Sequence, residues 1–191
     1  SLSIADSVSS IGHYAFTGCT SLTSVTLPNS LTAINADLFA GCTSLTDVTI
    51  PNSVTSIAFQ AFYGCSSLES ITIPGSVTSI GSGAFFDCSS LTRVTILPGS
   101  LAELGDSAFS GCAALSSITL PDSLTGIGAY AFYNCASLTE VTIPEGVTSI
   151  GTQAFLGCTS LRSLTIRGNI TSAGYRAFYG CTSLETVTIE E

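Results

Sequence analysis

Eight cysteines are the residues of this sequence with the clearest capacity for chemistry. They recur every 23 residues, apart from one step of 24, as Cys19, Cys42, Cys65, Cys88, Cys112, Cys135, Cys158 and Cys181. An even number of cysteines could form disulfides. In a stack of parallel, in-register coils, however, their Cβ atoms would lie near the strand spacing, which exceeds the roughly 3.8 Å that a relaxed disulfide prefers. We therefore predict a ladder of buried free thiols.

Metal binding and catalysis are not favoured by the remaining reactive residues. The chain has one histidine, His13, and no CxxC pair, so it lacks the usual cysteine and histidine sets that bind zinc. His13 stands at a repeat position that other copies fill with unrelated residues, and we interpret it as a solvent-facing side chain. Asp47 and Glu69 could be neighbours on adjacent strands, but no cleft accompanies them. A serine–histidine–aspartate triad needs an irregular pocket, whereas repeats form a smooth surface. We expect no enzyme activity and no cofactor.

Threonine forms the most regular outward column. It stands at one strand position in every repeat, as Thr26, Thr49, Thr72, Thr95, Thr119, Thr142, Thr165 and Thr188. Stacked β-branched residues suit a sheet, and each threonine pair contributes about 0.2 to 1 kcal/mol, so we interpret the ladder as structural. A flat threonine array is also similar to the ice-binding face of repeat antifreeze proteins, which remains a minor alternative. Charged residues interrupt the neighbouring column, where only Thr186 completes a TxT pattern with Thr188.

One repeat unit must position all of these residues. Its first part, such as residues 22–27, alternates apolar and hydroxyl side chains and predicts a strand, which ends at a proline-containing turn. A short extended segment such as residues 54–57 follows. Phe62 with Cys65 three residues later then predicts one turn of helix or 3₁₀ helix. Glycine, asparagine or aspartate precedes each cysteine and suits a left-handed closing residue.

One repeat is a residue longer than the others, and the extra residue is Leu97. It stands between the end of a predicted strand and the turn proline, Pro98. A local defect costs less than loss of register along the whole array. We therefore predict a one-residue bulge between Ile96 and Pro98, with the flanking coils in register.

The shared pattern CxxLxxVxIPxxVTxIGxxAFxG closely resembles the BspA-like, or treponemal-type, leucine-rich repeat over essentially the whole chain. Because one coil cannot bury its own apolar side, the coils must stack. We predict an α/β solenoid of eight coils of about 23 residues, with a parallel sheet on the concave face. Short helical or 3₁₀ turns and extended segments would form the other sides. Residues 1–191 are expected to be one array whose ends lie inside a repeat, with caps missing.

The resemblance implies a cell-surface or secreted protein that acts in adhesion and in recognition of host or matrix proteins. This chain departs from many members of the family because it has no lysine. With a net charge of −9, it lacks the clustered cations that nucleic acid binding requires. No apolar run approaches the roughly 18 residues of a membrane span, so we expect no membrane insertion. Asn169 begins the one glycosylation sequon, which matters if the source secretes through a eukaryotic pathway.

A few charges break the hydroxyl-rich strand face and mark our candidate binding residues. They are Asp47, Glu69, Arg93, Glu140, Arg162 and Glu185. We predict that this face binds a protein or a glycan, although scattered charges could serve solubility alone. A second candidate is an aromatic set near the predicted helical turns, namely Tyr63, Phe86, Tyr133, Tyr179, Tyr130 and Tyr175. The alternative from another class is a structural element that self-associates through uncapped ends or laterally into a fibre or sheath.

Overall fold

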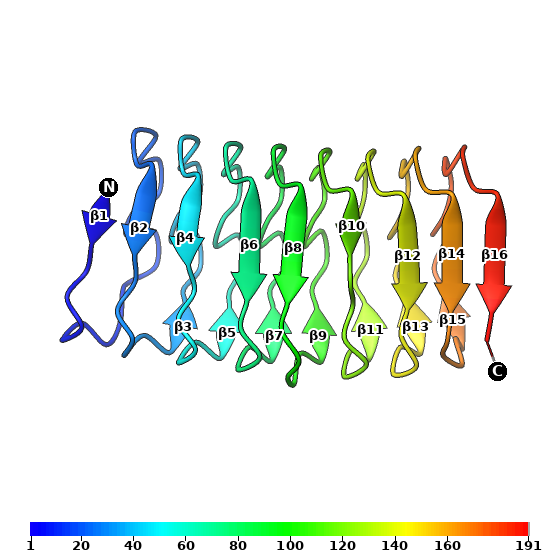
Figure 1. Ribbon diagram of the computed structural model, residues 1–191, viewed down its shortest axis with the longest axis horizontal. Coiled ribbons are helices and arrows are strands. Elements are labelled where there is room, and N and C mark those ends of the chain that lie inside the picture. The colour runs from blue at the N-terminus through cyan, green and yellow to red at the C-terminus, as the bar shows by residue number, and fades with distance from the viewer. Residues whose placement is uncertain (191) are drawn as a thin grey trace.

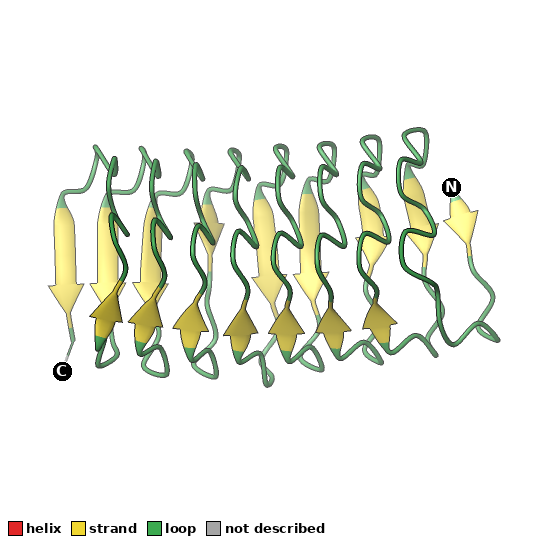
Figure 2. Ribbon diagram, turned by 180° about the vertical axis from the view of Figure 1, so that it is seen from behind, coloured by secondary structure: helices red, strands yellow, loops and turns green. Residues whose placement is uncertain are grey.

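Parallel strands line two opposite sides of a stack of coils in the computed structural model, which describes residues 1–190 (Figures 1 and 2). One side, which we call the long-strand face, comprises β1 (Leu2–Ser3), β2 (Ser24–Thr26), β4 (Asp47–Thr49), β6 (Ser70–Ile73), β8 (Arg93–Ile96), β10 (Ser117–Ile118), β12 (Glu140–Ile143), β14 (Ser163–Ile166) and β16 (Thr186–Ile189). The other side, the short-strand sheet, comprises β3 (Ala33–Ile34), β5 (Ser56–Ile57), β7 (Ser79–Ile80), β9 (Glu103–Leu104), β11 (Gly126–Ile127), β13 (Ser149–Ile150) and β15 (Ser172–Ala173).

Neighbouring coils pair in register, as the repeat predicts. The long-strand face divides into three hydrogen-bonded groups, β1-β2-β4, β6-β8-β10 and β12-β14-β16, whereas the short-strand sheet is continuous. Within the groups, Val25 pairs with Val48, and Thr142 pairs with Thr165. The valines are buried, because alternate residues of a strand point to opposite sides. The predicted solenoid of about eight stacked, parallel coils is therefore confirmed.

The predicted helical turns are absent, and the α/β class is wrong: residues 1–190 contain strands and turns but no helix. Hydrogen bonding explains the difference. The Tyr63 N–H donates to the Gln60 carbonyl within one coil (3.0 Å), whereas the Gln60 and Gly64 N–H groups donate to Ser82 and Phe86 in the next coil (3.0 and 2.7 Å). Gln60 and Gly64 both have positive φ, 50° and 65°. The segment is thus a series of turns cross-linked to its neighbour.

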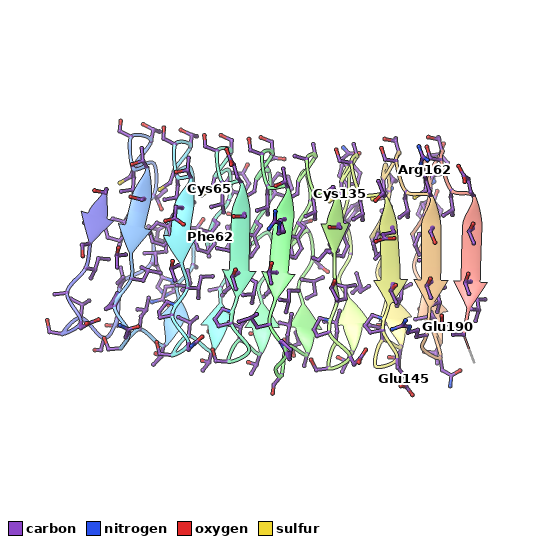
Figure 3. All side chains as sticks on the ribbon, viewed as in Figure 1. Phe62, Cys65, Cys135, Glu145, Arg162 and Glu190 are labelled. Atoms are coloured by element: carbon purple, nitrogen blue, oxygen red, sulfur yellow. The ribbon has the colours of Figure 1, made fainter. Side chains whose placement is uncertain are left out.

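A stack of phenylalanine rings runs through the core. It consists of Phe16, Phe39, Phe62, Phe85, Phe109, Phe132, Phe155 and Phe178. Successive ring centroids lie 5.1 to 5.7 Å apart, with interplanar angles of 4° to 17°. Phe62, which is labelled in Figure 3, is fully buried. The ring spacing therefore follows the spacing of the coils.

The extra residue is absorbed at one corner of one coil. Ile73 pairs with Ile96, 23 residues apart, and Ser79 pairs with Glu103, 24 residues apart. The offset therefore arises after β8, where Leu97 is 40% exposed. The loop below β8 extends beyond its neighbours (Figure 1). The predicted local defect, with flanking coils in register, is confirmed.

Candidate functional site

All six predicted binding residues are exposed on the long-strand face, and they fall in two adjacent columns. Asp47, Arg93 and Glu140 belong to the column defined by the pairs Ser24–Asp47, Ser70–Arg93 and Glu140–Ser163. Glu69, Arg162 and Glu185 belong to the column one residue earlier, immediately before β6, β14 and β16. There the Thr92 N–H donates to the Glu69 carbonyl and the Glu185 N–H to the Arg162 carbonyl, both at 2.9 Å. Figure 3 marks Arg162 beside the start of β14.

In the column of Glu69, Arg162 and Glu185, hydroxyl side chains form hydrogen bonds to the backbone of the preceding coil. The Thr46 hydroxyl donates to the Thr23 carbonyl (3.1 Å), and the Thr139 hydroxyl donates to the Ser116 carbonyl (3.2 Å). These bonds hold the side chains against the preceding coil. Among residues 1–190, the six charged candidates form no ion pair, and the one salt bridge joins Arg167 to Glu190 at 3.0 Å. The charged side chains are thus available to a partner, whereas the hydroxyls of Thr46 and Thr139 are already hydrogen-bonded within the fold.

The threonine ladder lies on the same face. Thr26 pairs with Thr49, and Thr165 pairs with Thr188. Six of the eight threonines are exposed, whereas Thr142 and Thr165 are half-buried. The ladder is therefore in register but unequally accessible along its length.

The cysteines occupy one column of the interior, although their burial is uneven. Six are buried from Cys42 to Cys158, Cys181 is half-buried, and Cys19 is exposed, contrary to the prediction. All eight are free thiols. Each cysteine from Cys42 onward donates its Sγ–H to the phenylalanine carbonyl of the preceding coil, at 3.1 to 3.3 Å. Burial raises the pKa of the Cys88 and Cys135 thiols to about 12.

His13 has a structural contact that the sequence did not predict. Its side chain is exposed, as expected, but its Nδ1 accepts a hydrogen bond from the Ala36 N–H at 3.1 Å. Asp106, at the equivalent position, accepts one from the Ala129 N–H at 2.7 Å. The sequence contained a sign of this contact, because histidine and aspartate, which can both accept a hydrogen bond, stand at the same repeat position. In the stack, that position lies opposite a backbone N–H of the next coil.

The aromatic candidates lie on the outer side of the turn segments that follow the short strands. Tyr63 stacks on Phe86, with centroids 5.3 Å apart. Further along, Arg176 lies over the rings of Tyr175 and Tyr179, at 4.9 and 4.8 Å from their centroids. These residues thus form an aromatic surface separate from the charged columns. Asn169 is exposed in the corner after β14.

Residues 1–190 contain no group of three histidine, cysteine, aspartate or glutamate side chains arranged to hold a metal ion. In the same part of the chain, no helix has the length and apolar character needed to span a membrane.

Comparison with known proteins shows which proteins share this repeat and this architecture. The model of the BspA type leucine rich repeat region matches residues 1–112 and 95–191, with six copies. A leucine-rich repeat protein from Bacteroides ovatus is 34% identical, with a TM-score of 0.76, over 99% of this chain and 55% of that one. The leucine-rich repeat protein of T. pallidum is 33% identical, with a TM-score of 0.62, over 91% of this chain and 70% of that one.

The chain thus spans about half the length of the B. ovatus protein. A search of curated proteins gives no match. The matched repeat model covers both halves of the sequence, and the two solved structures share its stacked parallel coils. The chain belongs to the BspA type leucine-rich repeat family.

Proposed function

We propose that this chain is a non-enzymatic recognition module, displayed at a cell surface or secreted, whose long-strand face binds a protein or a glycan. The observation that carries the proposal is the placement of six unpaired charges on an otherwise neutral, hydroxyl-rich face. Membership of the BspA type family supports the surface location and the recognition role.

The arrangement of charges supports recognition rather than catalysis. Glu69 and Arg93 stand on neighbouring coils, and Glu140 and Arg162 repeat the pairing of signs three coils further on. Extended solenoid faces present repeated scaffold positions at fixed spacing, so charges at a few of them can select a partner. Mixed signs favour a partner whose own charges alternate, and such complementarity contributes mainly specificity and association rate.

The test compares partner binding by two variants, one altered on this face and one altered elsewhere. The on-face variant carries Glu69→Gln, Arg93→Gln, Glu140→Gln and Arg162→Gln, and the off-face variant carries Glu103→Gln, Glu145→Gln and Arg176→Gln. Both sets are exposed, so neither should alter folding. Wild-type chain is measured against immobilised extracellular-matrix proteins and a glycan array. Partners of the wild type should bind the on-face variant about tenfold or more weakly, and the off-face variant equally well.

Equal binding of the on-face variant and the wild type would refute the role of this face. Loss of binding in both variants would show that the effect is not confined to this face and would also count against the proposal. A thermal-hysteresis assay separates the ice-binding alternative, which requires activity in the absence of any macromolecular partner.

A further inference from the structure

A column on the outer side of the turn segments carries aromatic rings at four of its eight positions, and Ser110 stands between two of them. The column runs through one position of each repeat and consists of Thr17, Ala40, Tyr63, Phe86, Ser110, Tyr133, Leu156 and Tyr179. An adjacent outward position contributes Ser107, Tyr130 and Gln153 in the coils around Ser110. Small residues thus stand at both positions of one coil, between coils that carry rings.

These small residues leave a cavity of about 330 Å³, which we call the ring slot. It is lined by Phe86, Ser107, Ser110, Tyr130, Tyr133, Gln153 and Leu156. Phe86 forms one wall, and Tyr130 and Tyr133 form the other, with their centroids 6.0 Å apart at an interplanar angle of 68°. The slot is lined by turn segments that follow the short strands, and Figure 2 draws these segments toward the viewer. It is therefore separate from the charged columns of the long-strand face.

The spacing of the coils sets the width of this slot. The core rings of Phe85, Phe109 and Phe132 lie beside the three coil positions of the slot and are spaced by 5.2 and 5.7 Å. The Phe86 and Tyr133 positions are therefore about 11 Å apart along the stack. A six-membered ring held midway would lie about 5.5 Å from each wall, within the 4.5 to 7 Å range of favourable aromatic contacts. The slot thus has the dimensions of one missing ring.

Three uncharged polar side chains line the slot beside the rings, namely those of Ser107, Ser110 and Gln153. Ser110 is 3% exposed and belongs to the coil between the two walls. Among residues 1–190, no buried side-chain oxygen or nitrogen lacks a hydrogen-bond partner, so the fold itself does not require a ligand here. Hydroxyl and amide groups both donate and accept hydrogen bonds, so a ligand in the slot can bond with them through hydroxyl groups of its own.

We propose that the ring slot binds one neutral pyranose ring of a glycan. A pyranose has apolar C–H faces that can lie against the Phe86 and Tyr133 rings. Its rim of hydroxyl groups can bond with the Ser110 and Ser107 hydroxyls and the Gln153 amide. None of the seven lining residues is charged, which favours a neutral sugar over an acidic one.

Two other flat ligands fit less well. A phenylalanine side chain of a partner would stack equally well but would leave the Ser110 hydroxyl facing apolar carbon. A nucleotide would bring phosphate toward a chain of net charge −9. The proposal concerns a different surface from the long-strand face and does not depend on it.

The test fills the slot with the residue that the repeat itself uses. Ser110→Tyr places a ring where Tyr63 and Tyr133 have theirs, and Ala40→Tyr adds the same ring at the same repeat position outside the slot. Saturation-transfer NMR is recorded with methyl β-glucopyranoside, methyl α-mannopyranoside, methyl β-galactopyranoside and lactose as probes, and with N-acetylphenylalaninamide as the competing ligand class. Circular dichroism checks that both variants fold.

We expect saturation transfer to at least one sugar with the wild type and with Ala40→Tyr, and its loss, by about tenfold in affinity, with Ser110→Tyr. A sugar signal that survives in folded Ser110→Tyr would overturn the proposal, as would the absence of any sugar signal with the wild type. Binding of N-acetylphenylalaninamide in place of the sugars, abolished by Ser110→Tyr, would assign the slot to aromatic side chains instead. If Ser110→Tyr does not fold, Phe86→Ala gives the same comparison by removing one wall.

Discussion

The cysteine position is determined by hydrogen bonding as much as by size. The Phe62 carbonyl accepts the N–H of Cys65 in its own coil and the Sγ–H of Cys88 in the next, both at 3.2 Å. A carbonyl oxygen has two lone pairs, so both donors can be accommodated. Cysteine combines a small apolar side chain with a weak donor, and both properties suit this interior site. The spacing of phenylalanine and cysteine within each repeat therefore links adjacent coils.

We predict that the folded state loses stability as the pH rises above about 9. Burial raises the pKa of Cys88 and Cys135 from the ordinary value of 9.0 to about 12, and raises the Cys112 pKa strongly. Above pH 9.0 the unfolded chain releases these protons while the folded chain keeps them. Each thiol therefore contributes its full stabilisation below that pH and loses about 1.4 kcal/mol per pH unit above it, up to its folded pKa.

Urea unfolding followed by circular dichroism from about pH 8 to about pH 11 measures this slope. The control is the double variant Cys112→Ala and Cys135→Ala. Removing two buried thiols should reduce the slope by about 2.7 kcal/mol per pH unit. An unchanged slope would mean that the buried thiols do not govern alkaline unfolding.

At the scale of elements, the strands could be predicted from the sequence, whereas the turns could not. Alternating apolar residues fix a strand and its inward face. A phenylalanine three residues before a cysteine suits a helical turn and a series of linked turns equally well. Hydrogen bonds to the next coil decide between them, and a single repeat does not reveal them. Gln60 and Arg176 stand at the same repeat position, and both have positive φ. Most copies have a residue other than glycine there, so the sequence shows no glycine pattern that would predict the left-handed bend.

The phenylalanine stack should carry a large part of the stability of each coil. Phe62 is fully buried between Phe39 and Phe85, whereas the next residue, Tyr63, is 38% exposed. We predict that Phe62→Ala lowers the free energy of unfolding by about 3 to 5 kcal/mol, because it removes a ring and leaves a cavity. Tyr63→Ala should cost about 1 kcal/mol, since its ring is partly hydrated. Chemical denaturation compares the two, and equal losses would contradict the assignment of the core.

The corner after β8 should tolerate the loss of its extra residue. Deleting Leu97 would restore the 23-residue spacing, and its side chain contributes little to the core because it is 40% exposed. We predict that the deletion changes the free energy of unfolding by about 1 kcal/mol or less. Deleting Leu120, which is buried after β10, is the control, since it would shift every later residue of that corner. That variant should lose the cooperative melting transition that the Leu97 deletion keeps.

For the whole molecule, periodicity predicts which residues face outward, but irregular sites arise between repeats. Asp47, Arg93 and Glu140 are exposed because their strand positions alternate with buried ones. Glu69, Arg162 and Glu185 are exposed in the residue before a strand begins. The ring slot depends instead on small residues that coincide in two columns, at Ser107 and Ser110, beside rings of the neighbouring coils. Only the stacking of three coils brings these residues together. Sequence analysis of one repeat at a time therefore misses such a cavity.

We predict that the 191-residue chain stays monomeric over a roughly hundredfold range of concentration. Its net charge of −9 opposes association. The strand β16 could favour it, because Val187 and Ile189 are 53% and 70% exposed and unpaired strand edges can template pairing. Light scattering at low and high salt measures the balance, and Val187→Lys with Ile189→Lys is the variant that blocks contact at β16. A constant mass of one chain would support a recognition module. Open-ended growth that the lysine variant abolishes would instead support end-to-end assembly. Growth that persists in the lysine variant would support lateral assembly. Either kind of growth would favour a structural role for this repeat protein.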